Sequence, residues 1–350
     1  MLPWLSAAAD PGRVHTEGLA ARGAVETARE QVGALLGARP REVVFTSGAT
    51  ESINAAVWGA TERGDHVVAT RVEHSAVIET SSRHDVTWAA VDGQGRVDVD
   101  SLANAIRPDT ALVHVQWGNH EVGTLQPVAD VVGLCRERGV LVHVDAAAAA
   151  GHVPVAFDDV GADFLSVSAH KLGGPHGVGA LLVRRSLRVR PFLVGAEQER
   201  ARRAGMENLA AIVGFGAAAA SLADEGHLDG EAARARSLTG RALDAAVALP
   251  GVVAYGDTDG RLPHLVCIGV GGVEAEAVVL GLDQAGIAVH SGSACSSESL
   301  EPSPVLEAMG VDAERSLRIS VGWSTTDDDI DAFSAALPEV VTRLRSLRPS

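Results

Sequence analysis

Short apolar runs alternate with longer stretches of helical spacing along the first half of the chain. The spacing in ATESINAAVWGATERG (49–64) and PVADVVGLCRERG (127–139) predicts helices that end near Gly64 and at Gly139. The apolar runs predict strands at EVVFTS (42–47), HVVAT (66–70), ALVHVQW (111–117), GVLVHVD (139–145), DFLSVSA (163–169) and GVGALLVRR (177–185). Apolar strands separated by helices are typical of an α/β fold, in which helices cover both faces of a mostly parallel sheet.

The second half has a different pattern. The Ala-rich stretch 208–249 predicts helices that bridge two domains, and short apolar runs between 262 and 323 predict a smaller α+β unit. The segment 327–347 is amphipathic and begins with three aspartates, as expected for a solvated helix start. We therefore expect a large domain at 12–227 and a small C-terminal domain at 228–350, with residues 1–11 packing against the small domain.

Composition and charge narrow the function. The 350 residues carry a formal net charge of −16, which argues against a nucleic-acid partner because phosphate binding needs local Lys and Arg. No signal peptide or membrane-spanning run stands out. The three cysteines, Cys135, Cys267 and Cys295, form no CxxC pair, so we expect a reducing cytoplasmic setting with neither a disulfide framework nor a metal site.

Four stretches carry candidate chemistry. Lys171 follows the strand of SVSAHKLGGPHGVGALLV (166–183), where a partly desolvated amine can form a Schiff base with a carbonyl cofactor; a structural or surface role is the alternative. Asp145 ends another strand, which could be the neighbour of the strand before Lys171, and suits the pyridinium nitrogen of pyridoxal phosphate, although it could instead cap the next helix. FTSGATES (45–52) runs into a helix N-terminus that could bind a phosphate or simply be capped. His74, at a strand end in RVEHSAV, could stack on a ring or serve structure alone.

Together these stretches resemble the cysteine desulfurase family, pyridoxal phosphate enzymes of the class V aminotransferase group. The resemblance implies fold type I, in which the large domain has a mostly parallel seven-stranded sheet and the smaller C-terminal domain is α+β. The resemblance extends over nearly the whole chain from about Gly12, and the cysteine-containing motif is its most specific part. The motifs that carry it are REVVFTSGATESIN, EHSAV, NHEVGTLQPV, VHVDAA, SVSAHKLGGPHGVGALLVRR, EQERARRAGMENLAAIVGFG, SGSACSSESLEPSPVLEAMG and LRISVGWSTTDDDID.

The resemblance implies a function and a role for each matching residue. L-cysteine would be converted to L-alanine, with its sulfur left as a persulfide on Cys295 for a protein acceptor or scaffold. Lys171 would bind the cofactor covalently and move the substrate Cα proton, and His74 would assist that transfer. Arg318 and Asn119 would bind the substrate. The resemblance assigns cofactor binding to Lys171, Asp145, His74, Ala49, Thr50, Ser168, His170 and His120. It also implies a homodimer, without a membrane or nucleic-acid partner.

Several positions depart from the family pattern. His120 stands where the family usually has Asn, Ala148 replaces a Gln that hydrogen-bonds the cofactor ring oxygen, and Met206 replaces a Thr that reaches the partner subunit's phosphate. Only LSAAAD (5–10) resembles the family's N-terminal segment. At about 1 kcal/mol for each lost hydrogen bond, cofactor affinity would fall by about one to three decades. Trp323 replaces a common Arg and is interpreted as packing.

Two alternatives therefore stay open beside the desulfurase. One is a related pyridoxal phosphate-dependent C–S lyase or aminotransferase in which Cys295 is not catalytic. The other is a degenerate scaffold that binds a sulfur-transfer partner but holds the cofactor weakly, as Ala148 and Met206 would suggest.

Overall fold

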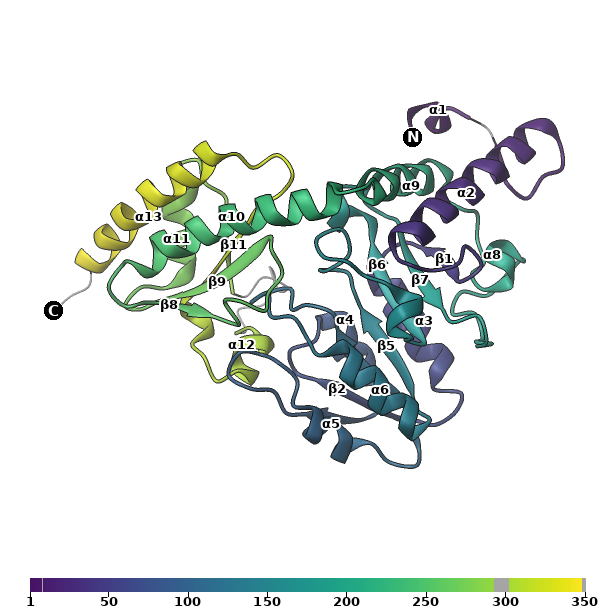
Figure 1. Ribbon diagram of the computed structural model, residues 1–350, viewed down its shortest axis with the longest axis horizontal. Helices are drawn as coiled ribbons and strands as arrows, with labels where there is room; N and C mark the ends of the chain where they lie inside the picture. Colours follow the sequence, from purple (N-terminus) through teal and green to yellow (C-terminus); the bar gives the residue numbers. More distant parts are fainter. Residues whose placement is uncertain (8, 293–301, 348–350) are drawn as a thin grey trace.

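The computed structural model of the chain describes residues 1–7, 9–292 and 302–347. Two β-sheets, each with its own apolar core, are joined by a long helix that runs between them (Figure 1). This arrangement matches the predicted α/β architecture of a large sheet followed by a smaller α+β unit.

The large sheet has seven strands in the order β1-β7-β6-β5-β4-β2-β3. Its strands are β1 (Val43–Thr46), β2 (His66–Thr70), β3 (Asp85–Ala89), β4 (Thr110–Gln116), β5 (Leu141–Asp145), β6 (Phe164–Ser168) and β7 (Gly179–Val183). Five neighbouring strands, β3, β2, β4, β5 and β6, pair in parallel. Strand β7 is antiparallel to both of its neighbours, β6 and β1. The prediction of a mostly parallel sheet is confirmed. The strand β3 was not predicted, because this edge strand is largely half-buried and lacks a continuous apolar run.

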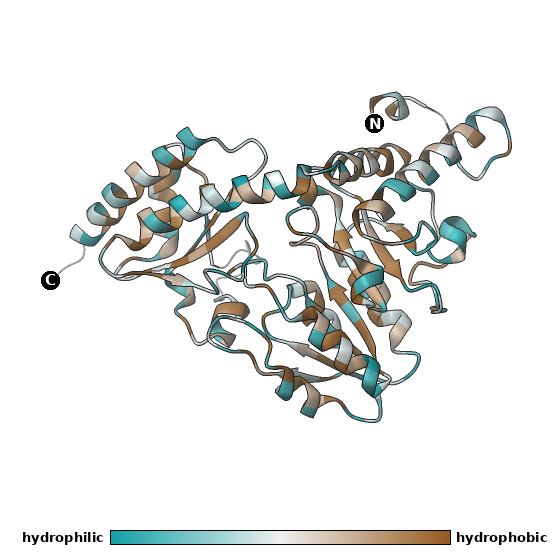
Figure 2. Cartoon of the chain, in the orientation of Figure 1, coloured by the Kyte–Doolittle hydropathy of each residue, from teal (hydrophilic) through white to brown (hydrophobic). Residues whose placement is uncertain are grey.

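Helices cover both faces of this sheet. Val113, Val142 and Leu165 share one core with α2, α6 and α9, whereas Leu112 and Phe164 point to the opposite face and pack with α3. Successive side chains of a strand point to opposite faces, so both faces of these strands are apolar. The central strands are accordingly coloured largely as hydrophobic in Figure 2. The helices of this part are α1 (Leu2–Leu5), α2 (Thr16–Leu35), α3 (Ala49–Ala60), α4 (Ser75–Ser81), α5 (Val99–Ala105), α6 (Val128–Arg138), α7 (Phe157–Val160), α8 (Gln198–Ala201) and α9 (Leu209–Ala223).

The smaller unit is built on an antiparallel sheet of four strands in the order β10-β11-β9-β8. Helices α10, α11 and α13 pack with it around a second core. The predicted bridging helices are confirmed as α9 and α10, and α13 starts with a capping box formed by Thr326 and Asp329. The elements are α10 (His227–Val247), β8 (Val252–Tyr255), β9 (Leu265–Val270), α11 (Ala275–Asp283), β10 (His290–Ser291), α12 (Pro304–Ala308), β11 (Ser316–Ser320) and α13 (Asp327–Ser346).

The N-terminal segment does not pack against the small domain, and that expectation is wrong. Helix α1 contacts α9 (Figure 1), and Trp4 packs against the core of the large sheet. Met1 lies against Gly214 of α9, where the missing side chain leaves room for it. Within the described residues no single helix is long and apolar enough to cross a membrane. Taken together, the bent pair of α9 and α10 has the length and composition that a membrane span requires.

Candidate active site

Lys171 lies just beyond the carboxyl end of β6. Strand β6 ends at Ser168, and a single 3₁₀ turn, Ala169–Leu172, carries the lysine. Gly173 ends that turn with φ of 83°, a left-handed conformation that glycine adopts without strain. The backbone carbonyl of Lys171 accepts a hydrogen bond from His152 Nε2 at 2.9 Å. The Gly-Gly after the lysine therefore serves to turn the chain sharply and to present Lys171 at the sheet edge.

Asp145 is the last residue of β5, the parallel neighbour of β6. The prediction that the strands carrying Asp145 and Lys171 are neighbours is confirmed, and both residues stand at the same edge of the sheet. The Asp145 side chain is buried, and its Oδ1 accepts the Ala147 N–H at 2.9 Å. No helix begins directly after it, so the helix-cap alternative is wrong. Burial raises the pKa of Asp145, while the charges of His74 and Lys171 oppose that rise.

Two histidine rings meet beside this carboxylate. His74 caps α4, with its Nδ1 accepting the Ala76 N–H at 3.0 Å, so the proton of the neutral ring is on Nε2. The ring of His120 lies 5.1 Å from it, tilted by 58°. Burial lowers the pKa of both rings, and for His120 the positive charges of His74, Arg318 and Lys171 lower it further. These shifts favour the neutral form of each imidazole, and a proton on His74 further disfavours one on His120.

The start of α3 meets the end of β6 and forms a candidate phosphate site. The Ala49 N–H donates to Ser168 Oγ at 2.9 Å, which joins two residues that are 119 positions apart. The N-cap Gly48 makes no side-chain cap, and Thr50 in the first turn is exposed. His170 is also exposed, with its ring 5.3 Å from that of His176. Backbone N–H groups at a helix start together with hydroxyl groups suit a phosphate.

Arg318 reaches the site from the small domain, on β11. Its Nη1 donates to the His120 carbonyl at 3.0 Å, and its buried Nε has no hydrogen-bond partner among the described residues. A guanidinium with unused donors is suited to bind a carboxylate in two-point fashion. The structure thus brings Arg318 to the same place as His120.

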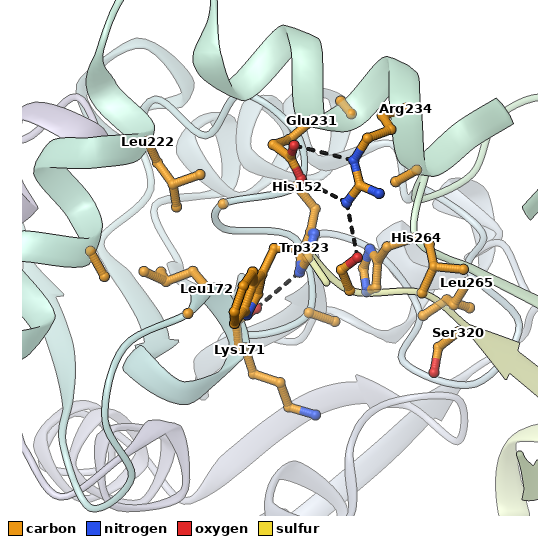
Figure 3. A pocket seen from close by; sticks show the side chains of 18 of the residues that line it. His152, Lys171, Leu172, Leu222, Glu231, Arg234, His264, Leu265, Ser320 and Trp323 are labelled. Carbon is orange, nitrogen blue, oxygen red and sulfur yellow. Dashed lines mark hydrogen bonds and ion pairs between the residues drawn. The ribbon is translucent and has the colours of Figure 1, made fainter. Parts of the chain in front are cut away.

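A cavity of about 660 Å³ lies between the two domains and is lined by Lys171, Arg318, His120 and Ala148. Figure 3 shows Lys171 in its wall, with Trp323 close by. His152 of the large domain and His264 of the small domain both line this cavity and stack on each other. Their ring centroids are 3.6 Å apart, and the angle between the ring planes is 19°. The sequence had not suggested this pair, because each histidine is isolated along the chain.

Trp323 also lines the cavity and is 81% exposed, so the interpretation of Trp323 as a packing residue is wrong. It follows the end of β11 in a turn whose carbonyls, Gly322 O and Thr325 O, accept hydrogen bonds from Arg234. The turn is held at its backbone, which leaves the indole outside the small-domain core.

Asn119 does not face the substrate cavity, and its expected substrate-binding role is wrong. The side chain is fully buried, and its Nδ2 donates to the Val72 carbonyl at 3.0 Å. Its Oδ1 accepts the N–H groups of Glu121 and Val122, each at 2.8 Å. The Asn119 amide therefore forms hydrogen bonds within the turn, which satisfy the polar atoms of this buried side chain.

Glu121 is a site residue that the sequence did not reveal. It is 3% exposed, and its Oε2 accepts a 2.6 Å hydrogen bond from Ser303, the N-cap residue of α12. Burial raises the pKa of Glu121 to about 7, against the hydrogen bond from Ser303. A carboxylate in the turn NHEVG was the only available signal, and its contact in the small domain could not be inferred from it.

The three cysteines differ in setting. Cys135 and Cys267 are buried, and burial raises the pKa of each thiol to about 12, as expected for inert core residues. Cys295 lies outside the described residues, so its role stays a prediction. Within the described residues, no group of three or more His, Cys, Asp or Glu could hold a metal ion.

A lysine and a buried carboxylate at the ends of neighbouring parallel strands, beside a helix start suited to phosphate, define a pyridoxal phosphate-dependent enzyme of fold type I. The model of the aminotransferase class-V family matches residues 5–333. The chain belongs to this family, and within it to the cysteine desulfurases.

Relatives support this assignment over nearly the full length. Cysteine desulfurase IscS 1 of Archaeoglobus fulgidus is 40% identical, with 100% of this chain and 94% of the relative covered. Among solved structures, a NIFS-like protein is 32% identical with a TM-score of 0.90, covering 97% of this chain and 93% of its own. SspA in complex with cysteine is 30% identical with a TM-score of 0.80, covering 91% and 92%. The activity of this protein is therefore that of a cysteine desulfurase.

Proposed function

We propose that the enzyme removes sulfur from L-cysteine at the cavity between the domains and passes it through Cys295 to a protein acceptor. The observation that carries this proposal is that Lys171 follows the strand next to the one that ends at Asp145, and that it lines one cavity with Arg318, whose Nε has no hydrogen-bond partner among the described residues. The solved structure of SspA, which is similar over most of its length, contains cysteine and supports the same substrate here.

The residues present fit pyridoxal phosphate. The N–H groups at the start of α3, with Ser168, Thr50 and His170, would hold the phosphate, and Asp145 would face the ring nitrogen. The neutral rings of His74 and His120 would contact the cofactor ring, and Lys171 would bind it covalently. When bound, the cofactor supplies an electron sink for the substrate carbanion.

The chain's own residues then have distinct tasks. Arg318 binds the substrate carboxylate, and Lys171 Nζ takes the proton from the substrate Cα. The Cys295 thiolate attacks the substrate sulfur, so that an S–S bond forms as the substrate Cβ–S bond breaks. The electron pair of that bond stays with Cβ, which is protonated to give alanine, and the persulfide remains on Cys295.

A direct assay separates this function from the two alternatives. Purified protein is incubated with L-cysteine, and alanine is quantified while the peptide that contains Cys295 is weighed by mass spectrometry. Alanine together with one added sulfur atom on Cys295 supports the proposal. Alanine with released elemental sulfur but no persulfide, or pyruvate and ammonia with sulfide, indicates the lyase alternative, and a protein that binds no pyridoxal phosphate indicates the degenerate scaffold.

Ala148 provides a test of how this chain holds its cofactor. Ala148→Gln is expected to tighten cofactor binding by up to about tenfold, because it adds one hydrogen-bonding side chain worth about 1 kcal/mol to the cavity wall. The dissociation constant is measured by titrating apoprotein with pyridoxal phosphate and following visible absorbance. Ala148→Leu is the matched control, and an equal gain in that variant would show that packing rather than hydrogen bonding causes the effect.

We also propose a homodimer in the cytoplasm. Trp58, Phe192, Val194 and Met206 are exposed, and Trp58 and Phe192 contact each other with ring centroids 6.2 Å apart. An exposed apolar surface of this kind suits a second copy of the chain. Val194→Asp should shift the protein toward monomer in analytical ultracentrifugation, whereas an unchanged dimer would place the interface elsewhere.

A further inference from the structure

Glu73, the residue before His74, is a buried carboxyl that the proposed chemistry does not use. It is 2% exposed, and its Oε1 accepts the backbone N–H of Gln116 at 3.0 Å. Its Oε2 is buried without a hydrogen-bond partner among the described residues. Among the described residues, one backbone N–H is thus the hydrogen-bond partner of this carboxyl.

The Glu73 side chain accepts a hydrogen bond from β4 beyond the point where the backbone ladder between β2 and β4 ends. Strand β2 ends at Thr70, whereas its neighbour β4 runs on to Gln116. The Gln116 N–H therefore has no strand carbonyl opposite it on that side, and the Glu73 carboxyl takes that place. Glu73 thus closes the ladder at the edge where the site is built.

Two further hydrogen bonds join the same turn to β4. The Val72 carbonyl accepts Gln116 Nε2 at 2.7 Å and Asn119 Nδ2 at 3.0 Å. Gln116 is in turn the register partner of Asp145 on β5. The turn that presents His74 and the strand end that presents Asp145 are therefore connected through Gln116.

Burial and a neighbouring charge determine whether the Glu73 carboxyl is protonated. The charged group that acts on it is Asp145, another buried acid, while His74 and Lys171 act on Asp145. Burial, and then the charge of Asp145, raise the pKa of Glu73 to about 8. Two buried carboxylates close together do not both ionise readily.

We propose that Glu73 is a positioning residue that keeps its proton in the folded site, fixing His74 and Asp145 relative to each other without adding a second negative charge beside Asp145. A neutral carboxyl can accept the Gln116 N–H without adding a second charge beside Asp145. This inference extends the proposed function, but its main test does not depend on the cofactor.

The test compares wild type, Glu73→Gln and Glu73→Ala as apoproteins between pH 5 and pH 9, with Tm as the readout. Because folding raises the pKa of Glu73, the folded protein binds the extra proton. The stability contributed by this group is full below about pH 4.5 and is lost as the pH rises through about 8. Glutamine is neutral at every pH. The Tm of Glu73→Gln minus the Tm of wild type should therefore increase by at least ~2 °C from pH 5 to pH 9.

Glu73→Ala should lower Tm throughout this range, because the Gln116 N–H loses its acceptor. Glu42→Gln controls for changing a buried glutamate that accepts backbone N–H groups, here those of Arg39 and Arg185. A Tm difference between Glu73→Gln and wild type that is constant with pH, or one that Glu42→Gln reproduces, would overturn the protonated state. An unchanged Tm in Glu73→Ala would overturn the positioning role.

A second readout uses the visible band of bound pyridoxal phosphate, which reports the surroundings of its ring. At pH 7 the band of Glu73→Gln should coincide with that of wild type, and that of Glu73→Ala should be displaced. Coincidence of all three bands contradicts the proposed link to His74 and Asp145. If no variant binds the cofactor, the proposed function fails, while the pH dependence of Tm still decides the state of Glu73.

Discussion

Lys171→Ala is expected to give a colourless protein and to reduce alanine release from L-cysteine by about 10²–10⁴-fold or more. Lys171 is the only lysine in the sequence. All the other residues among the 29 Lys and Arg of the chain are arginines. Arginine stays protonated at neutral pH and cannot replace an amine nucleophile or base. No second amine on a side chain is therefore available to hold the cofactor covalently.

The single lysine also makes the experiment unusually specific. Reduction of the yellow wild-type protein with borohydride, followed by peptide mass spectrometry, should locate the cofactor on the peptide that contains Lys171. Lys171→Arg is the matched control, because it keeps a positive charge at the end of β6 but removes the amine. A yellow, reducible Lys171→Ala protein, or a label elsewhere, would contradict the role given to this residue.

Cys295→Ala is expected to reduce alanine release by at least ~10²-fold and to abolish the persulfide, while the visible band of the cofactor is retained. Neither remaining cysteine can substitute, because Cys135 and Cys267 are buried and burial raises the pKa of each thiol to about 12. Single-turnover measurement of alanine, with mass spectrometry of the protein, checks both parts of this expectation.

Cys135→Ala is the appropriate control, since this thiol lies inside α6 with no exposed surface and should affect stability more than turnover. Undiminished alanine formation in Cys295→Ala would remove the persulfide step and favour the lyase alternative. Loss of the cofactor band in that variant would mean that the substitution has damaged the site itself.

The site could be predicted from the sequence where one residue carries its own local signal. Lys171 comes after an apolar strand and two residues before the pair Gly173-Gly174, and Asp145 ends a second strand of the same kind. In a parallel sheet the carboxyl ends of strands meet at one edge, so these two groups were expected together and are found on neighbouring strands.

The errors share a physical origin. Asn119 was expected to bind substrate, but its amide is consumed by Val72, Glu121 and Val122 in a turn. Trp323 was expected to pack, but it stands 81% exposed at the cavity. In each case the residue type was compatible with either role, and only its burial and its hydrogen-bond partners distinguish them.

By itself the sequence determined the chemical groups of this protein: one lysine, a carboxylate at a strand end, a hydroxyl-bearing helix start and a cysteine in a segment of small residues. Those assignments depend on local order along the chain, which sequence preserves. Only the tertiary structure decided that His152 stacks on His264, that Ser303 binds Glu121 and that Glu73 completes the edge of β4. These contacts join residues far apart in the chain, and the protonation state of each buried group follows from its partners rather than from its identity.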